Sequence, residues 1–200
     1  MSGGTPAAAR VVFRSAAEVI GRVGPAGLTL AVVAREVGLV PGTLVQRFGS
    51  KRGLLLALAE RSAKDTEARS GTGRAAHESA LGALAALVVE PMALMDAPET
   101  YANHLAFLCI DLTDPEFRRH ALAIHQAQGR AVEGLLAEAL RTGELRAGTD
   151  VGALAGSVQA ITSGAGLLWA LDRRGALAQR VRAELDHLLS PHRRSATEES

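Results

Sequence analysis

Two short amphipathic segments separated by one glycine constrain the fold of this chain more than any other feature. Residues 29–37 begin with Thr29, which can cap a helix, and continue with apolar residues at helical spacing up to Gly38. The second segment starts near Pro41, a residue favoured in the first turn of a helix, and runs to Phe48. Two short helices joined by a glycine turn predict a helix-turn-helix.

A longer helix is predicted directly after these two segments. Gly49 ends the second segment, and Ser50 can cap a helix that continues through several leucines. Lys51 and Arg52 fall in the first turn of this helix, where positive side chains oppose the helix dipole. A phosphate bound by Lys51 and by the free backbone N–H groups of the turn would explain this arrangement. We therefore expect Lys51 to contact the backbone of a nucleic acid.

The string AREVGLVPGTLVQRFGSKRGLLLA is similar to the DNA-binding segment of the tetracycline-repressor (TetR) family of bacterial transcriptional regulators. The resemblance covers about residues 9–60, and both residue types and spacings agree. It is carried by Gly38, Gly42, Thr43, Leu44, Phe48, Ser50 and Lys51. It implies a regulator with a helix-turn-helix head and a helical body that binds a small molecule. Most members of the family repress transcription and release DNA when the ligand fills the body.

Two positions depart from the family pattern. Val40 stands where the family usually has a serine that caps the second helix, and Val45 where it usually has a tyrosine that touches DNA phosphate. A lost cap costs a helix about 0.5–2 kcal/mol, so the predicted fold tolerates the change. These two valines leave one alternative open, a helical ligand-binding or scaffold protein that has lost DNA binding.

The second short helix carries polar side chains that can reach the bases of DNA. Glutamine can pair bidentately with adenine and arginine with guanine, so Gln46 and Arg47 are candidates for base contacts. Thr29 and Lys51 are expected to position the head on the phosphate backbone. One head makes few contacts, so we expect a dimer on a roughly palindromic operator. The predicted DNA-binding residues are Thr29, Thr43, Val45, Gln46, Arg47 and Lys51.

Charge is divided unevenly along the chain. Residues 1–52 contain seven basic and two acidic side chains, a net charge of +5. The other 148 residues contain 15 basic and 19 acidic side chains, a net charge of −4. A basic head on a mildly acidic body is typical of a protein that binds double-stranded DNA through the head.

Apolar residues recur at helical spacing along the rest of the chain, which predicts an all-α fold of about nine helices. We predict a helix-turn-helix domain at residues 1–50 and a helical-bundle domain for ligand binding and dimerisation at 51–190. Within the second domain, residues 51–68 form the connecting helix. A disordered tail is expected at 191–200. The remaining helices are predicted at 8–22, 75–95 with a kink at Pro91, 100–112, 115–142, 150–171 and 175–189.

Residues 150–171 predict a helix with an unusual number of glycines. Each internal glycine weakens a helix by roughly 0.8–1 kcal/mol relative to alanine, so four of them need a packing reason. Small residues recur on one face, which lets another helix approach closely. We predict that this helix and the one at 175–189 form the interface of a homodimer; a buried internal helix is the alternative. The predicted interface residues are Gly152, Gly156, Ala160, Gly164, Leu167, Leu171, Val181 and Leu185.

The body contains side chains that suit a small-molecule pocket. Methionine and aromatic residues offer flexible apolar surface, and histidine and glutamine add hydrogen-bonding groups. No lysine or arginine occurs in residues 75–117 or 147–172, so we expect an apolar or amphipathic effector. An ordinary core or surface role is the alternative for each residue. The predicted ligand-binding residues are Met92, Met95, His104, Phe107, His125, Gln128 and Trp169.

The single cysteine and the absence of export signals predict a cytoplasmic protein. Cys109 has no partner for an internal disulfide, which fits a reducing compartment, and its apolar neighbours predict a place in the core. Residues 1–9 lack the charged and apolar regions of a signal peptide. The sequence contains no run of about 18 apolar residues free of charges and glycines, so no membrane span is predicted.

An enzymatic function is not predicted. The sequence has no phosphate-binding loop, no GxSxG motif and no dinucleotide fingerprint. His104 and His125 lack the ligand spacing of known zinc motifs, and a small helical metalloenzyme built on them is kept as an alternative. We predict no catalytic residue, no metal site and no cofactor.

Overall fold

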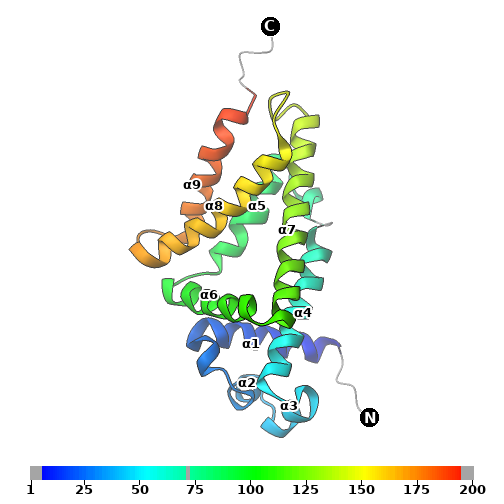
Figure 1. Ribbon diagram of the computed structural model, residues 1–200, viewed down its shortest axis with the longest axis vertical. Coiled ribbons are helices and arrows are strands. Elements are labelled where there is room, and N and C mark those ends of the chain that lie inside the picture. Colours follow the sequence, from blue (N-terminus) through cyan, green and yellow to red (C-terminus); the bar gives the residue numbers. More distant parts are fainter. Residues whose placement is uncertain (1–5, 71–72, 195–200) are drawn as a thin grey trace. The chain divides into compact units, whose positions relative to one another are not determined.

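The computed structural model describes residues 6–70 and 73–194 (Figure 1). This part of the chain is helical, with nine α-helices, two short 3-10 helices and only one isolated β-bridge, which confirms the predicted all-α fold. The α-helices are α1 (Pro6–Gly27), α2 (Leu30–Glu36), α3 (Pro41–Phe48), α4 (Lys51–Ser70), α5 (Ala80–Ala93), α6 (Pro98–Thr113), α7 (Pro115–Arg141), α8 (Val151–Asp172) and α9 (Leu177–Leu189). The 3-10 helices are Gly73–Ala76 and Ser190–His192.

The helices form two compact units. The first contains the chain up to Lys64 together with Glu99–Ala123, and therefore α1 to α3, most of α4, α6 and the start of α7. The second contains Asp65–Pro98 and the chain from Ile124 onward, with α5, the rest of α7, α8 and α9. The predicted division at residue 50 stays a prediction.

The predicted helix-turn-helix is present as α2 and α3. The hydroxyl of Thr29 accepts a hydrogen bond from the backbone N–H of Val32 at 3.1 Å and caps α2. Gly38 in the turn has φ +67°, a backbone conformation that favours glycine. Val40 precedes α3 and makes no side-chain cap, because its apolar side chain has no hydrogen-bond acceptor. The N-terminus of α3 therefore lacks the hydroxyl cap that α2 has.

The core of the first unit joins α3 to α1 and α4. Leu44 of α3 is 1% exposed, and the Phe48 ring lies 5.9 Å from the Phe13 ring of α1, measured between centroids. Burying one such leucine contributes roughly 1.5–3 kcal/mol. The largest side chains of this core also include Val12, Val19, Ile20, Leu28, Val33, Leu54, Leu58 and Phe117.

Helix α6 packs on the end of α1 through Asn103. Its side-chain amide donates to the carbonyl oxygen of Gly21 at 2.8 Å. Gly24 interrupts α1 with φ +71°, and a Cβ there would lie 2.9 Å from Oδ1 of Asn103. The prediction that Cys109 lies in the core is wrong, because Cys109 is exposed, as is Leu112 on the same helix at 57%. One face of α6 packs on the head and another is exposed. The apolar composition of the helix gave no indication of which face is which.

Helices α5, α8 and α9 pack together in the second unit. Trp169 of α8 is 3% exposed, and its indole N–H donates to the carbonyl oxygen of Gly175 at 2.9 Å. This bond connects the end of α8 to the turn that leads into α9. Other buried side chains of this core are Leu84, Val88, Val132, Leu136, Leu145, Leu154, Val158, Leu177, Val181, Leu185 and Leu189.

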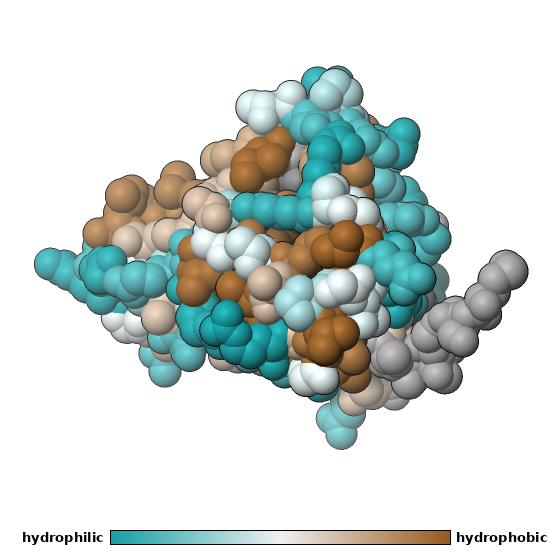
Figure 2. Space-filling view, turned by 90° about the horizontal axis from the view of Figure 1, so that it is seen from below, coloured by the Kyte–Doolittle hydropathy of each residue, from teal (hydrophilic) through white to brown (hydrophobic). Residues whose placement is uncertain are grey.

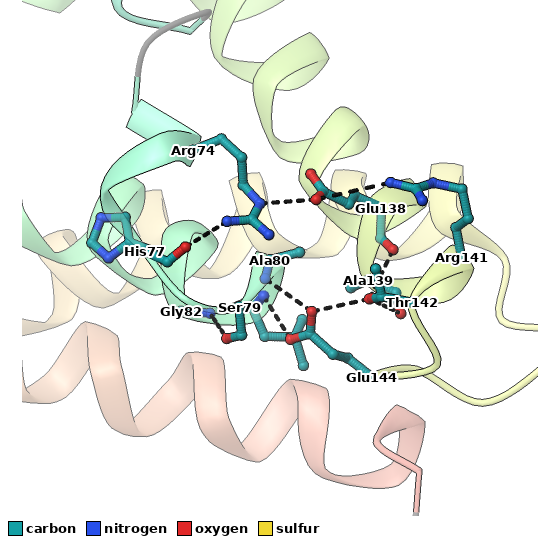
Figure 3. Close-up of polar contacts among 11 residues, drawn as sticks. Arg74, His77, Ser79, Ala80, Gly82, Glu138, Ala139, Arg141, Thr142 and Glu144 are labelled. Atoms are coloured by element: carbon teal, nitrogen blue, oxygen red, sulfur yellow. Dashed lines mark hydrogen bonds and ion pairs between the residues drawn. The ribbon is translucent and has the colours of Figure 1, made fainter.

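The turn after α7 caps the start of α5 (Figure 3). The Glu144 carboxylate accepts hydrogen bonds from the backbone N–H groups of Ala80 and Leu81 at 2.9 and 3.1 Å. Partial burial raises the pKa of Glu144, but these bonds and those from the hydroxyls of Thr142 and Ser79 outweigh burial and hold the pKa below its ordinary value. A carboxylate at this position also complements the helix dipole.

The start of the predicted C-terminal tail is paired with the same turn. The backbone N–H of Arg146 donates to the carbonyl oxygen of His192 at 2.8 Å, and that of Arg194 donates to Glu144 at 3.2 Å. Residues 191–194 are therefore part of the fold. The rest of the predicted tail, 195–200, lies outside the described residues.

Glu144→Ala should lower the free energy of unfolding of the second unit by about 1–3 kcal/mol, because it leaves two helix N–H groups without an acceptor. Glu144→Gln keeps an acceptor and should cost less. The folded pKa of Glu144 is depressed, so its contribution is full above the ordinary carboxyl pKa and is lost as the pH falls through the folded value. Urea unfolding at several pH values measures both effects.

Glu133→Ala is the matched control for this experiment, because Glu133 is an exposed carboxylate on α7. It should change the unfolding free energy by less than about 0.5 kcal/mol. Equal losses for the two alanine variants would contradict the capping role of Glu144.

Candidate nucleic-acid interface

Helix α3 presents one face to solvent. Successive residues of an α-helix are rotated by about 100°, so Gln46 points away from the buried Leu44, while Val45 and Arg47 flank it. Thr43, Val45, Gln46 and Arg47 are all exposed. Figure 2 looks onto the side of the first unit where α2 and α3 lie and shows separate hydrophobic patches among hydrophilic residues. The predicted base-contacting side chains therefore share an accessible surface.

Arg47 carries an available positive charge on this face. Its guanidinium lies 5.3 Å from the centroid of the Phe48 ring, and it makes no ion pair within the described residues. Arg22, in contrast, forms an ion pair with Glu36 that links α1 to α2. An unpaired arginine beside exposed threonine and glutamine side chains suits a nucleic-acid surface.

Lys51 has a structural partner that the sequence did not indicate. Its ammonium donates to the carbonyl oxygen of Pro25 and lies 3.5 Å from that of Ala26, at the C-terminal end of α1. A cation at this end of a helix is favoured by the dipole, so the arrangement does not require a phosphate. The hydroxyl of Thr29 likewise has a partner within the fold, because it caps α2. Phosphate contacts of Lys51 and Thr29 stay predictions.

Arg52 connects the head to the start of α7. Its guanidinium donates to carboxylate oxygens of Asp114 and Glu116, each at 2.8 Å, and lies 5.4 Å from the centroid of the Phe117 ring. The hydrogen bond from Arg52 is the largest cause that holds the pKa of Asp114 below its ordinary value. Sequence reasoning missed this link. The only signal was the predicted start of a helix at residue 115, which indicated no partner for Arg52.

The predicted ligand-binding residues fall into both compact units. His104 and Phe107 belong to the first unit. The Nε2 atom of His104 lies 3.1 Å from where a Cβ of Gly21 would be, and burial lowers the pKa of His104. The Phe107 ring packs edge-on against Phe117 with 6.2 Å between centroids. His104 therefore lies against α1, and Phe107 packs against α7.

The other predicted ligand-binding residues lie in the second unit. Trp169 is core, and the backbone carbonyl of His125 accepts from the Gln159 side chain at 3.0 Å. Met92 and Met95 are half-buried, and Gln128 is exposed. A surface hollow of about 360 Å³ in this unit contains none of them; it is lined by Ser79, Leu81, Gly82, Glu144, Arg182, Arg193 and Arg194. The pocket assignment stays a prediction.

Six of the eight predicted interface residues lie on an accessible face of α8. Gly152, Gly156, Ala160, Leu167 and Leu171 are exposed, and Gly164 is half-exposed. Val181 and Leu185 of α9 are each only 1% exposed, so they pack in the core of their own chain. Helical periodicity placed these two residues on an apolar face without showing which helices cover it. They are removed from the candidate interface.

Comparisons with known proteins decide the family. Residues 12–58 match the family model of "Bacterial regulatory proteins, tetR family", and residues 109–185 match that of "Tetracyclin repressor-like, C-terminal domain". The chain belongs to the TetR family. The second match extends the assignment to α7, α8 and most of α9, which resembled the family only in length and helical style. A comparison with curated protein sequences finds no significant match.

Solved TetR-like structures share the fold along nearly the whole chain. A putative regulator from Saccharomonospora viridis in complex with choline has a TM-score of 0.74 at 20% identity, over 93% of this chain and 97% of that one. A putative TetR-family regulator from Rhodococcus sp. gives 0.68 at 22% identity, over 92% and 98%. FadR from Bacillus subtilis in complex with stearoyl-CoA gives 0.67 at 20% identity, over 90% and 97%.

Two further features of this TetR-family chain bear on the alternatives. TetR-family regulators are generally not enzymes, and the described residues contain no group of three or more histidine, cysteine or acidic side chains that could hold a metal ion. Helix α8 is the one helix of the described residues that is long and apolar enough to cross a membrane, judged by length and composition alone. Of its most apolar stretch of 18 residues, 28% is buried within the chain.

Lys51→Ala should lower the stability of the protein without DNA by about 1–3 kcal/mol, because two carbonyl groups at the end of α1 lose their donor. Lys64→Ala on the same helix removes only an exposed pair with Glu60 and should cost less than about 0.5 kcal/mol. Thermal or urea unfolding monitored by circular dichroism compares the two variants. Equal stability of Lys51→Ala and wild type would contradict the structural role of Lys51.

Proposed function

We propose that this chain is a ligand-responsive transcriptional repressor that binds a palindromic operator as a homodimer through α3. The observation that carries the proposal is the accessible face of α3, with Thr43, Gln46 and Arg47 held on a rigid three-helix core. Membership of the TetR family and the net charge of +5 on residues 1–52 support it. A protein of this kind acts on DNA in the cytoplasm.

Homodimerisation rests on the exposed small-residue face of α8. Gly156 and Gly164 have open space where a Cβ would lie, so a helix of another chain can approach the backbone closely. Leu168 and Leu171 are 58% and 72% exposed at the end of the helix. Covering these side chains removes apolar surface from water and stabilises a dimer. A dimer places two copies of α3 on two half-sites, so the operator is palindromic.

The proposed effector is a small apolar or amphipathic molecule that binds the helical body. One structural relative is in complex with stearoyl-CoA, an amphipathic molecule, and another is in complex with choline, a small cation. Helix α6 belongs to the same compact unit as the head and is joined to it by Asn103. A ligand that displaces α6 would therefore displace α3 as well and release the operator.

A protein that has lost DNA binding is the second candidate function. The specific observation in its favour is Val40, which leaves the N-terminus of α3 without a side-chain cap. The buried Leu44 and the contact between Phe13 and Phe48 nevertheless hold α3 in place. DNA binding is therefore the better supported proposal.

Selection of tight-binding duplexes from a random pool, followed by titration at two salt concentrations, tests DNA binding. Wild-type protein should enrich one palindromic duplex, and its affinity should fall steeply with salt because phosphate contacts release counterions. Arg47→Ala should weaken binding to that duplex by about 1–3 kcal/mol and relax base choice at one position. Arg141→Ala, in the second unit, is the control and should leave the affinity unchanged. Equal, weak binding to every duplex would favour the second candidate.

Gly156→Arg should convert the dimer to a monomer, because a long charged side chain would occupy the contact face of α8. Gly134→Arg is the matched control, since Gly134 is also an exposed glycine inside a helix with open space around its Cβ position. Both changes should maintain or raise helix stability. Analytical ultracentrifugation measures the mass. A dimer formed by Gly156→Arg would contradict the proposed interface.

A further inference from the structure

We propose that Val45 reads the 5-methyl group of a thymine in each half-site of the operator. This inference rests on the proposed DNA binding and goes beyond it by assigning a base to one residue. It concerns a position at which the family pattern usually places a phosphate-contacting tyrosine. Valine has neither the length nor the hydroxyl group for that contact, so a DNA contact at this position has to be an apolar one.

Val45 has no role in the core that would explain an apolar side chain at this position. Its side chain is 50% exposed, whereas the core contacts of α3 are made by Leu44 at 1% exposure and by the half-buried Phe48. Exposed apolar surface is unfavourable in water, so covering this side chain on binding is favourable. Val45 is therefore available to a partner at no cost in packing.

The chemistry of valine selects one feature of the DNA major groove. Its side chain has no donor or acceptor, so it cannot bond to a phosphate or to the polar edge of a base. The C5-methyl group of thymine is the apolar group that the major groove presents, and apolar side chains recognise it by contact. A thymine at the facing position is therefore the base that Val45 favours.

The surroundings of Val45 allow a close approach to DNA. Gly42 lies three residues earlier on the same helix, and the space where its Cβ would lie is open, with no atom within 4 Å. A short side chain can reach a base when the neighbouring position leaves room for the groove wall. Gln46 lies beside Val45, and Arg47 flanks the face on its other side without an ion pair in the described residues. The polar and basic setting favours a polyanion over an apolar protein segment as the occupant.

Replacement of thymine by uracil in the selected duplex tests the inference, since it removes the methyl group and keeps the base pairing. Wild-type protein should lose about fourfold in affinity when the facing thymine of one half-site is replaced, the value expected for burial of one methyl group. Replacement in both half-sites should cost about fifteenfold, because separated positions contribute roughly additively. Fluorescence anisotropy with each thymine replaced in turn locates the position.

Val45→Ala should lower the uracil penalty well below fourfold, because loss of the two γ-methyl groups of Val45 removes most of the contact with the thymine methyl group. Val40→Ala is the matched control: Val40 is 70% exposed but precedes the helix, so this variant should keep the fourfold penalty. Circular dichroism confirms that both variants are folded. A uracil penalty that persists unchanged in Val45→Ala would overturn the inference, as would a duplex that wild type binds with no thymine position sensitive to uracil. Failure to enrich any duplex would overturn the proposed function together with it.

Discussion

The burial of Leu44 is the interaction on which the proposed DNA-reading surface depends. Helix α3 has only eight residues, and an isolated helix of that length is unstable in water. Leu44 and the contact between Phe48 and Phe13 attach it to α1, which leaves Gln46 and its neighbours exposed on a fixed support. The missing cap at the start of α3 is tolerated because tertiary packing supplies the stability that a hydroxyl would have added.

Three polar contacts extend this rigid support beyond the helix-turn-helix. Lys51 joins α4 to the end of α1, Asn103 joins α6 to α1, and Arg52 joins α4 to the start of α7. The Arg52 carboxylate partners are exposed in part, so this link is sensitive to salt. Because these contacts hold α6 and α3 in one compact unit, a ligand that displaced α6 would displace α3 with it.

The fold and the exposed face of α3 could be predicted from local sequence patterns, and the contacts that support this face could not. Helical periodicity, the Thr29 cap and the turn at Gly38 are signals within a few residues, so the helices were predicted. Their ends were less accurate: α1 extends five residues beyond its predicted end, and α5 begins five residues after its predicted start. Arg52 contacts residues more than sixty positions away, and no local sequence pattern predicts such a pair. The same limit explains Val181 and Leu185, since periodicity shows that a face is apolar but does not show what covers it.

Hydroxyl-radical footprinting of the complex with a selected duplex tests the central claim most directly. A dimer that reads DNA through two copies of α3 should protect two patches on one side of the duplex. Their centres should be related by a two-fold axis and lie one or more helical turns apart. A single protected patch, or uniform protection along the duplex, would contradict the account.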